Sequence, residues 1–181
     1  MASILNNGGH ILYVQCRFRK CGECMFKNTV KNIGFDLIVP RMKVSHYEQF
    51  YKMCTDLVAE HTPVPSNKLY EGLTSKMRLE RSLIGGGLLM ADMRVNGIQE
   101  PFAMLVTLDQ DVDFKAPDGV PVNVASVLLS PARDGNMHLS RVFRLTRLLK
   151  NDDLRNKLVE AKDEAAIQSL LLNPDGWMIA A

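Results

Sequence analysis

The sequence predicts an α/β fold: one domain in which a mixed sheet is flanked by helices. Two observations carry this prediction. Short apolar runs typical of buried strands alternate with segments whose apolar residues recur every three or four positions, as on one face of a helix. The regular pattern starts only at Phe35, and residues 20–27 before it form a basic, cysteine-bearing stretch. Strands that alternate with helices indicate a layered α/β architecture for the rest of the chain.

One strand and two helices are expected in the first half of this domain. Residues 36–40 form a short apolar run that suits a buried strand. Ser45 is placed to cap a helix with an apolar face. That face consists of Tyr47, Phe50, Tyr51, Cys54, Leu57 and Val58. Ser66 is placed to cap a second helix, which we expect to end at Met77.

The second half is expected to contain three strands followed by three helices. The strands are predicted at residues 84–90, 102–108 and 122–129, with a turn-rich loop at 113–119. The next helix should start near Met137 and bury Leu139, Val142, Phe143, Leu145, Leu148 and Leu149.

Two further helices are expected to close the domain. Asn151 should cap a short helix that ends near Ala161, and Asp163 should cap the last one. The inward face of that last helix is predicted to consist of Ala166, Ile167, Leu170 and Leu171.

Composition and charge argue against several classes of protein. The chain has 181 residues, of which 46% are hydrophobic and 23% charged, as in an ordinary globular protein. A net charge of +2 is too small to argue for nucleic acid or a membrane surface. No apolar run approaches the roughly 20 residues that span a bilayer. The first residues lack the basic region of a secretory signal. We therefore expect a cytoplasmic protein.

The most informative stretch covers residues 79–94, with the sequence LERSLIGGGLLMADMR. It resembles the active-site segment of the mannitol, fructose and nitrogen-regulatory type of IIA domain in the bacterial sugar phosphotransferase system. The family pattern there has the form R-E-x-L-x-S-T-x-I-G-x-G-I-A-I-P-H, and its last histidine accepts a phosphoryl group. Leu79, Ile84, Gly85 and Gly87 match the pattern, and Asp92 lies on the histidine.

The resemblance extends over about residues 35–172. Residues 44–60 follow the layout of the family's first helix, and residues 103–114 are similar to its strand and the turn after it. Residues 118–124 are similar to its "d-g-x-P-V-d-l" segment. The resemblance implies a mixed sheet with helices on both faces, an α/β/α sandwich that uses no cofactor. Residues 1–34 are then an N-terminal extension with a cysteine cluster, and residues 173–181 a C-terminal tail.

A phosphate site around Asp92 is what the resemblance implies. Phosphoryl transfer between carriers needs a neutral imidazole as nucleophile and positive charge for the phosphate oxygens. His138 lies on the family's second histidine. Lys76 lies on its arginine, so a cation is retained without the bidentate fork. Arg78 and Arg94 supply further cations nearby. The chain thus resembles a phosphocarrier that has lost its phosphate acceptor.

Asp92 allows three interpretations. Its carboxylate could form an acyl phosphate. It could mimic the charge of a phosphohistidine and hold the domain in a phosphorylated-like state. It could also be a solvated aspartate at the end of a strand.

His138 has two interpretations of its own. It could accept the phosphoryl group in place of Asp92, or it could be an ordinary surface residue at a helix start. The resemblance favours a regulatory, protein-binding domain that is not phosphorylated. Its partners would be the histidine phosphocarrier protein, a IIB domain or a regulated target. The alternative is an active phosphocarrier that uses His138 or Asp92.

The cysteines give a second, independent signal. Together, Cys16, Cys21, Cys24 and Cys54 have the spacing of a plant-type iron–sulfur ferredoxin, although Cys54 lies on an apolar helix face and is expected in the core. A zinc site that uses Cys16, Cys21, Cys24 and His10 is a further alternative, as is a redox pair of Cys21 and Cys24. The third functional hypothesis is therefore a metal- or redox-sensing module, while unligated thiols remain the simplest expectation.

Overall fold

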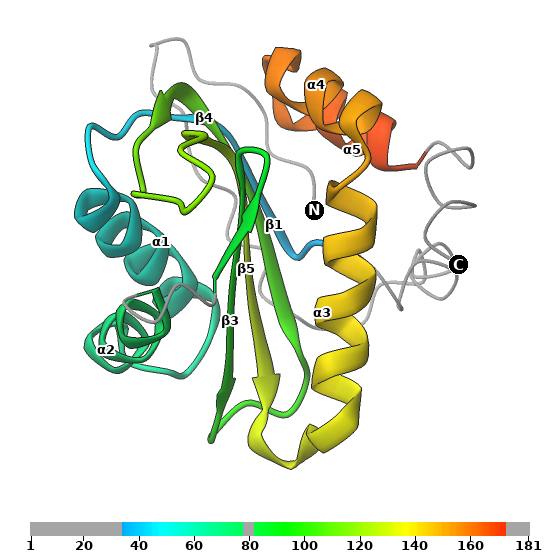
Figure 1. The fold of residues 1–181 in the computed structure, drawn as a ribbon. Coiled ribbons are helices and arrows are strands. Elements are labelled where there is room, and N and C mark those ends of the chain that lie inside the picture. The colour runs from blue at the N-terminus through cyan, green and yellow to red at the C-terminus, as the bar shows by residue number, and fades with distance from the viewer. Residues whose placement is uncertain (1–33, 78–81, 173–181) are drawn as a thin grey trace, which may run out of the picture. The chain divides into compact units, whose positions relative to one another are not determined.

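The computed structural model describes residues 34–77 and 82–172, which all belong to one compact unit of the chain. Within these residues the elements follow in an order that Figure 1 traces by colour. They are β1 (Leu37–Met42), α1 (Tyr47–His61), α2 (Ser66–Met77), β2 (Leu83–Gly85), β3 (Leu88–Val95), β4 (Phe102–Val112), β5 (Val122–Pro131), the 3-10 turn η1 (Ala132–Asp134), α3 (Gly135–Leu149), α4 (Asp152–Glu160) and α5 (Glu164–Leu171).

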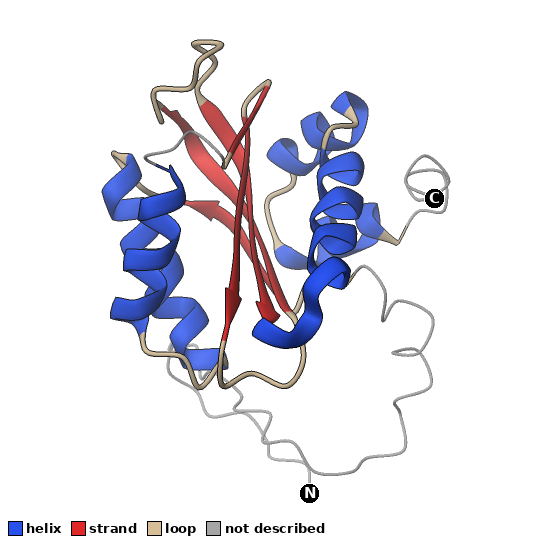
Figure 2. Ribbon diagram, turned by 60° about the horizontal axis from the view of Figure 1, so that its bottom comes forward, coloured by secondary structure: helices blue, strands red, loops and turns tan. Residues whose placement is uncertain are grey.

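Five strands form one mixed sheet in the order β1-β4-β5-β3-β2. The pairs β1–β4 and β3–β5 are parallel, whereas β4–β5 and β2–β3 are antiparallel. Figure 2 shows α1 and α2 on one side of the sheet and α3, α4 and α5 on the other. The predicted mixed sheet with helices on both faces is confirmed.

Each face of the sheet carries its own apolar core. Since successive side chains of a strand point to opposite faces, β3 serves both cores. Leu89 and Ala91 pack in the core under α1 and α2, whereas Leu88 and Met90 pack in the core under α3, α4 and α5. Asp92 continues the second series, so its side chain points to the side of α3.

An aromatic cluster fixes the loop after β4 against α1. The ring of Phe114 is fully buried although it lies in a loop. Its centroid is 5.3 Å from that of Phe50 and 6.2 Å from those of Tyr47 and Tyr51, in tilted or edge-on arrangements that aromatic pairs prefer. The loop at residues 113–119 is therefore anchored to the core at its start.

The prediction of a single strand at residues 84–90 was wrong. The glycine triplet instead forms the turn between β2 and β3, with φ values of +89°, +62° and +82° at Gly85, Gly86 and Gly87. Only glycine adopts such angles readily. A Cβ at Gly87 would also lie 3.1 Å from the Pro121 carbonyl oxygen, so the backbone packs closely there.

Two of the four predicted helix caps were wrong. The residue before α1 is His46, and its side chain makes no capping bond, while the backbone N–H of Ser45 donates to the Gln49 side chain. Ser66 is the first residue of α2 rather than its cap. Asn151 and Asp163 are confirmed as caps, because they accept from the backbone N–H groups at the starts of α4 and α5.

The apolar face predicted for α3 was too wide. Leu145, Leu148 and Leu149 are buried as expected, but Leu139 and Phe143 are exposed. At 100° per residue, Leu139 and Phe143 lie on the side of the helix opposite to Leu145. The prediction failed because α3 has apolar residues on two different faces, and only one of these faces is buried.

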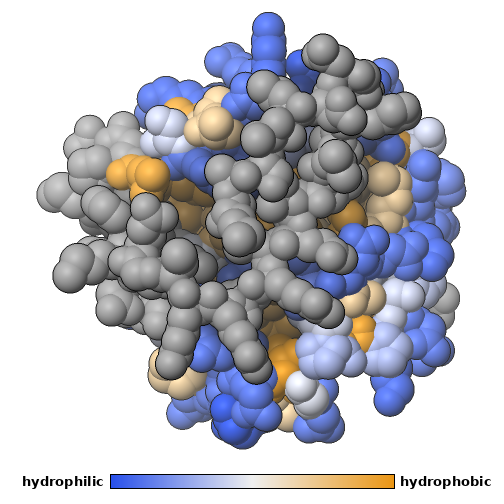
Figure 3. Space-filling view, turned by 180° about the vertical axis from the view of Figure 1, so that it is seen from behind, coloured by the Kyte–Doolittle hydropathy of each residue, from blue (hydrophilic) through white to orange (hydrophobic). Residues whose placement is uncertain are grey.

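No helix within residues 34–77 and 82–172 is both long enough and apolar enough to cross a bilayer. Seen from behind, the coloured rim of the molecule is mostly hydrophilic, with small hydrophobic patches between (Figure 3).

The free energy of unfolding should decrease at alkaline pH. Burial raises the pKa of the Cys54 thiol well above its usual value, and burial likewise raises the pKa of Tyr51. The unfolded chain therefore releases these protons at lower pH than the folded chain does. The stability that comes from the neutral thiol is fully present below about pH 8.5, and it declines as the pH rises above that unfolded value.

Urea denaturation of wild type and Cys54→Val at about pH 7 and about pH 9.5 measures this effect, since the two conditions bracket the usual thiol pKa. We expect wild type to lose more stability between the two conditions than the variant does. Equal losses would show that Cys54 does not titrate differently in the folded chain.

Candidate functional site

The candidate site lies where two parallel strands end and a helix begins. Asp92 of β3 pairs in register with Leu128 of β5, and Arg94 with Ser130. Because β3 and β5 run in the same direction, their carboxyl ends meet at one edge of the sheet, as at ligand sites of open α/β sheets. The chain then turns through η1 into α3, whose first turn carries His138.

Four side chains from four elements meet there, and we call them the Asp92 cluster: Lys76, Asp92, Ser130 and His138. Asp92 Oδ2 accepts from Lys76 Nζ at 2.6 Å and from His138 Nε2 at 2.9 Å. His138 Nδ1 lies 3.0 Å from Ser130 Oγ. The side chains of His138, Asp92 and Lys76 are 6%, 18% and 37% exposed, so the cluster runs from the interior to the surface.

Lys76 reaches Asp92 around the edge of the sheet. It lies in the last turn of α2, a helix that covers the face of the sheet opposite to α3. β2 pairs with β3 only at Leu88 and Leu89, so strand pairing does not cover β3 at Asp92 on that side. The absence of a side chain at Gly72 leaves room for the end of the Met93 side chain between α2 and β3. Asp92 is therefore contacted from both faces of the sheet.

The contacts fix the chemical state of the cluster. A half-buried carboxylate needs a partner, and Lys76 supplies the opposite charge. Since the Asp92 carboxylate accepts, Nε2 of His138 carries a proton. Nδ1 then accepts from the Ser130 hydroxyl when the ring is neutral and donates to it when the ring is charged. In both cases neither ring nitrogen has a lone pair that faces solvent.

Ser130, His138 and Asp92 have the residue types of a hydrolase triad, but the geometry does not suit one. Ser130 is fully buried, and Arg141 Nη1 also lies 3.5 Å from its Oγ. A nucleophile must reach a substrate. The Ser130 hydroxyl instead orients the imidazole, and Arg141 is itself held by Asp134.

Sequence reasoning did not single out Ser130, Arg141 or Asp134. Alternation along β5 was the available signal for Ser130, because it places this residue on the same face as Leu128. The register between β3 and β5 was also needed, and it is not visible in the sequence.

The structure brings together three of the five residues predicted from the resemblance: Lys76, Asp92 and His138. Arg78 lies outside the described residues. Arg94 is exposed, and it is not in any of the ion pairs found among the described side chains. The expectation that Asp92 ends its strand was wrong, because β3 continues to Val95.

Of the cysteine predictions, the structure addresses only that for Cys54. Its thiol is free and buried in the core under α1, as expected. Cys16, Cys21 and Cys24 lie outside the described residues, as does His10. Among residues 34–77 and 82–172, no three His, Cys, Asp or Glu side chains are grouped to hold a metal ion.

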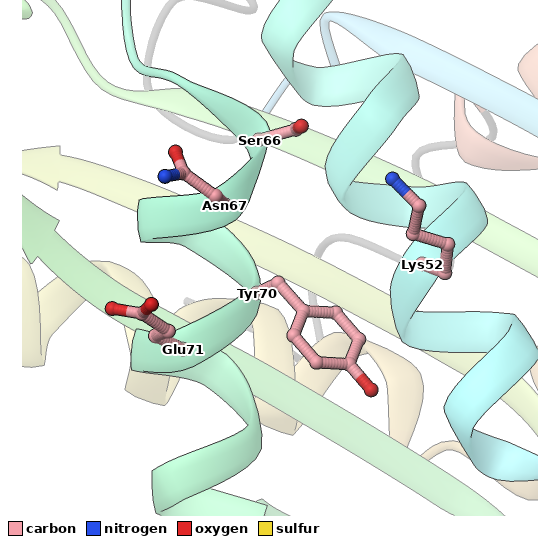
Figure 4. A pocket seen from close by; sticks show the side chains of 5 residues that line it. All are labelled: Lys52, Ser66, Asn67, Tyr70 and Glu71. Carbon is pink, nitrogen blue, oxygen red and sulfur yellow. The ribbon is translucent and has the colours of Figure 1, made fainter.

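A shallow hollow lies between α1 and the start of α2, apart from the Asp92 cluster. Figure 4 shows its lining, which consists of Lys52, Ser66, Asn67, Tyr70 and Glu71. Four of these residues belong to the first half of α2, whereas Lys76 lies in the last turn. The hollow adds no residue to the Asp92 cluster.

Comparison with known proteins identifies the family. Residues 35–173 match the model of the phosphoenolpyruvate-dependent sugar phosphotransferase system, EIIA 2, and the chain belongs to this family. It is 30% identical over 139 residues to a nitrogen regulatory protein of Bradyrhizobium diazoefficiens, which covers 77% of this chain and 91% of the relative. It is 28% identical over 88 residues to a fructose-specific EIIA component of Haloferax volcanii, covering 49% of this chain and 57% of that protein.

Solved structures confirm the fold. The nitrogen regulatory protein IIA-Ntr of Neisseria meningitidis superimposes with a TM-score of 0.69 at 20% identity, over 79% of this chain and 98% of that one. The mannitol IIA of Escherichia coli superimposes with a TM-score of 0.61 at 14% identity, over 74% of this chain and 94% of that one.

Proposed function

We propose that this chain is a regulatory, protein-binding member of its family that does not carry phosphate. The resemblance puts Asp92 at the position of the acceptor histidine. The observation that carries the proposal is the ion cluster at that position, in which one carboxylate oxygen accepts from both Lys76 Nζ and His138 Nε2. Lys76 and His138, which would otherwise contact a phosphoryl group, contact the Asp92 carboxylate instead.

The chemistry of a carboxylate acceptor supports this proposal. An acyl phosphate forms when a carboxylate oxygen attacks phosphorus. Oδ2 of Asp92 already accepts two hydrogen bonds, which lower its nucleophilicity. Such transfers also commonly use a metal ion to neutralise the charge of the phosphate. Within the described part of the chain, no cluster of acids stands near Asp92 to hold one.

Asp92 instead supplies a negative charge that does not depend on phosphorylation. A phosphoryl group carries about −1.5 to −2 charges at neutral pH, and a carboxylate carries one. The Asp92 carboxylate lies between a cation and an imidazole, and it carries its charge without any phosphoryl donor. A domain of this kind would present a constant surface to its partners rather than alternate between two states.

The relatives indicate what kind of partner to seek. Two relatives are named nitrogen regulatory protein, and the mannitol IIA of Escherichia coli has been solved in complex with phosphorylated enzyme IIB. By likeness, the partners of this chain would be a IIB domain, the histidine phosphocarrier protein or a regulated target in the cytosol.

An active phosphocarrier is the second candidate, and His138 is the observation that favours it. The fold keeps this imidazole beside a cation and oriented by Ser130. To act as acceptor, His138 would have to give up the 2.9 Å bond to Asp92 and become accessible from its 6% exposed position.

Phosphoryl labelling tests the proposal. The protein is incubated with phosphoenolpyruvate, enzyme I and the histidine phosphocarrier, and its intact mass is then measured. We expect no change in mass, while the mannitol IIA of Escherichia coli, treated in parallel, should gain one phosphoryl group.

A stoichiometric label would contradict the proposal, and two variants would then locate it. Loss of the label in His138→Ala but not in Asp92→Ala would assign the transfer to His138. The opposite result would assign an acyl phosphate to Asp92. Circular dichroism of both variants checks that they remain folded.

A further inference from the structure

The outer face of α3 is apolar although it faces solvent. Leu139 is 58% exposed and Phe143 is 76% exposed. Residues four apart are neighbours on a helix surface, so the two side chains form one continuous apolar strip. Met137 is also exposed. Three of the five large exposed hydrophobic residues in the described part of the chain thus belong to this one helix, the others being Val120 and Leu172.

Basic residues lie on one side of this strip and at its C-terminal end. The charged residues of α3 are Arg141, Arg144 and Arg147, and the helix carries no acidic residue. Arg144 is exposed next to Phe143, and Lys150 is exposed directly after the helix. At 100° per residue, Arg144 lies to one side of the strip, and Lys150 lies in line with it. The face therefore consists of an apolar centre with a basic rim on one side and at one end, formed by Arg144 and Lys150.

We propose that the outer face of α3 docks an acidic amphipathic segment of a partner protein. Apolar side chains of that segment would seat on Leu139 and Phe143, and its carboxylates would face Arg144 and Lys150. An apolar centre with a polar rim is the usual anatomy of a protein interface, and a helix face is read by partners with matching spacing.

This inference rests on the proposed function, because it names the partner chemistry of a binding domain. His138 of the Asp92 cluster lies in the chain between the exposed Met137 and Leu139, but its own side chain is buried against the sheet, so the strip and the cluster lie on different sides of α3.

Charge disfavours two other occupants of this face, a second copy of the chain and residues 1–33. A second copy would set the basic rim of α3 against the same basic rim, and like charges across an interface are costly. Residues 1–33 carry five basic residues, Arg17, Arg19, Lys20, Lys27 and Lys31, and one acidic residue, Glu23. The net charge of that segment is therefore positive, as is the rim of α3, so the two would repel each other. Nucleic acid phosphates would suit the rim but leave Leu139 without an apolar partner.

Binding of a designed peptide tests the proposal without phosphate donors. The probe is a fluorescent amphipathic helix with leucine at every third and fourth position and glutamate elsewhere. The control peptide has lysine in place of glutamate. Anisotropy with the full chain should show at least about tenfold tighter binding of the acidic peptide, a difference of about 1.4 kcal/mol. Added salt should weaken that binding.

Variants of exposed residues assign the surface. Phe143→Ala should weaken binding of the acidic peptide by about tenfold or more, since a buried aromatic anchor dominates such interfaces. Arg144→Glu should also weaken it. Leu172→Ala is the matched control, because Leu172 is 64% exposed and lies outside α3. It should leave the affinity unchanged.

Several results would overturn the proposal. These are no binding of the acidic peptide, equal binding of the lysine peptide, or full binding by Phe143→Ala. Binding of a single-stranded RNA that depends on Arg144 and not on Phe143 would overturn it as well, as would self-association that Phe143→Ala abolishes. Phosphoryl labelling and peptide binding are separate measurements. A chain that becomes phosphorylated and still binds the acidic peptide would contradict the proposed function but not the docking surface on α3.

Discussion

Asp92→His is expected to convert a chain that gains no phosphate into one that gains a phosphoryl group per molecule. The substitution places an imidazole where the resemblance puts the acceptor. It also removes the carboxylate that engages Lys76 at 2.6 Å, so that the ammonium group becomes available to the phosphate oxygens. His138 remains beside the new ring. Incubation with phosphoenolpyruvate, enzyme I and the histidine phosphocarrier, followed by intact mass, measures the gain.

A second aspartate in an ion pair provides the matched control. Asp109 of β4 pairs with Arg41 at 2.7 Å, so Asp109→His also places a histidine beside a cation on a strand. We expect no label there. A folded Asp92→His protein that stays unlabelled would contradict the assignment of Asp92 to the acceptor position.

Phe114→Ala is expected to lower the free energy of unfolding by about 3–5 kcal/mol. The ring is 1% exposed and contacts three aromatic rings of α1. Its loss leaves a cavity at the point where the loop after β4 is anchored. A loss of about 3–5 kcal/mol is a large fraction of the roughly 5–15 kcal/mol that stabilises a typical domain. Chemical denaturation followed by circular dichroism gives the value.

Phe143→Ala removes the same side chain from an exposed position and controls for the substitution itself. We expect it to change the free energy of unfolding by no more than about 0.5 kcal/mol. If Phe114→Ala cost less than about 1 kcal/mol, its ring would lack the buried contacts that give such substitutions their usual cost.

The strands and helices could be predicted largely because burial leaves a periodic record. β1, β4 and β5 lie where apolar runs indicated, and Asn151 and Asp163 cap helices as their residue types favour. The glycine triplet misled the prediction because apolar residues flank it on both sides. The sequence of β2, the glycine turn and β3 therefore looks like one apolar strand. Only the backbone angles of the glycines show the turn between the two strands.

The site was predictable only through resemblance. No periodic pattern connects Lys76, Asp92 and His138, which come from α2, β3 and α3. Ser130 was missed because its place depends on the register between β3 and β5. The exposed strip on α3 was missed for a related reason. Leu139 and Phe143 are as apolar as core residues, and only the packing of α3 shows which side faces the sheet.

A phosphorus NMR spectrum of the wild-type protein tests the central claim most directly. It is recorded at native pH after incubation with phosphoenolpyruvate, enzyme I and the histidine phosphocarrier, since phosphohistidine and acyl phosphate give separate resonances. We expect no protein-bound phosphorus, because the resemblance puts Asp92 at the acceptor position and its carboxylate engages both Lys76 and His138. A phosphohistidine signal that disappears in His138→Ala, or an acyl phosphate signal that disappears in Asp92→Ala, would contradict the claim.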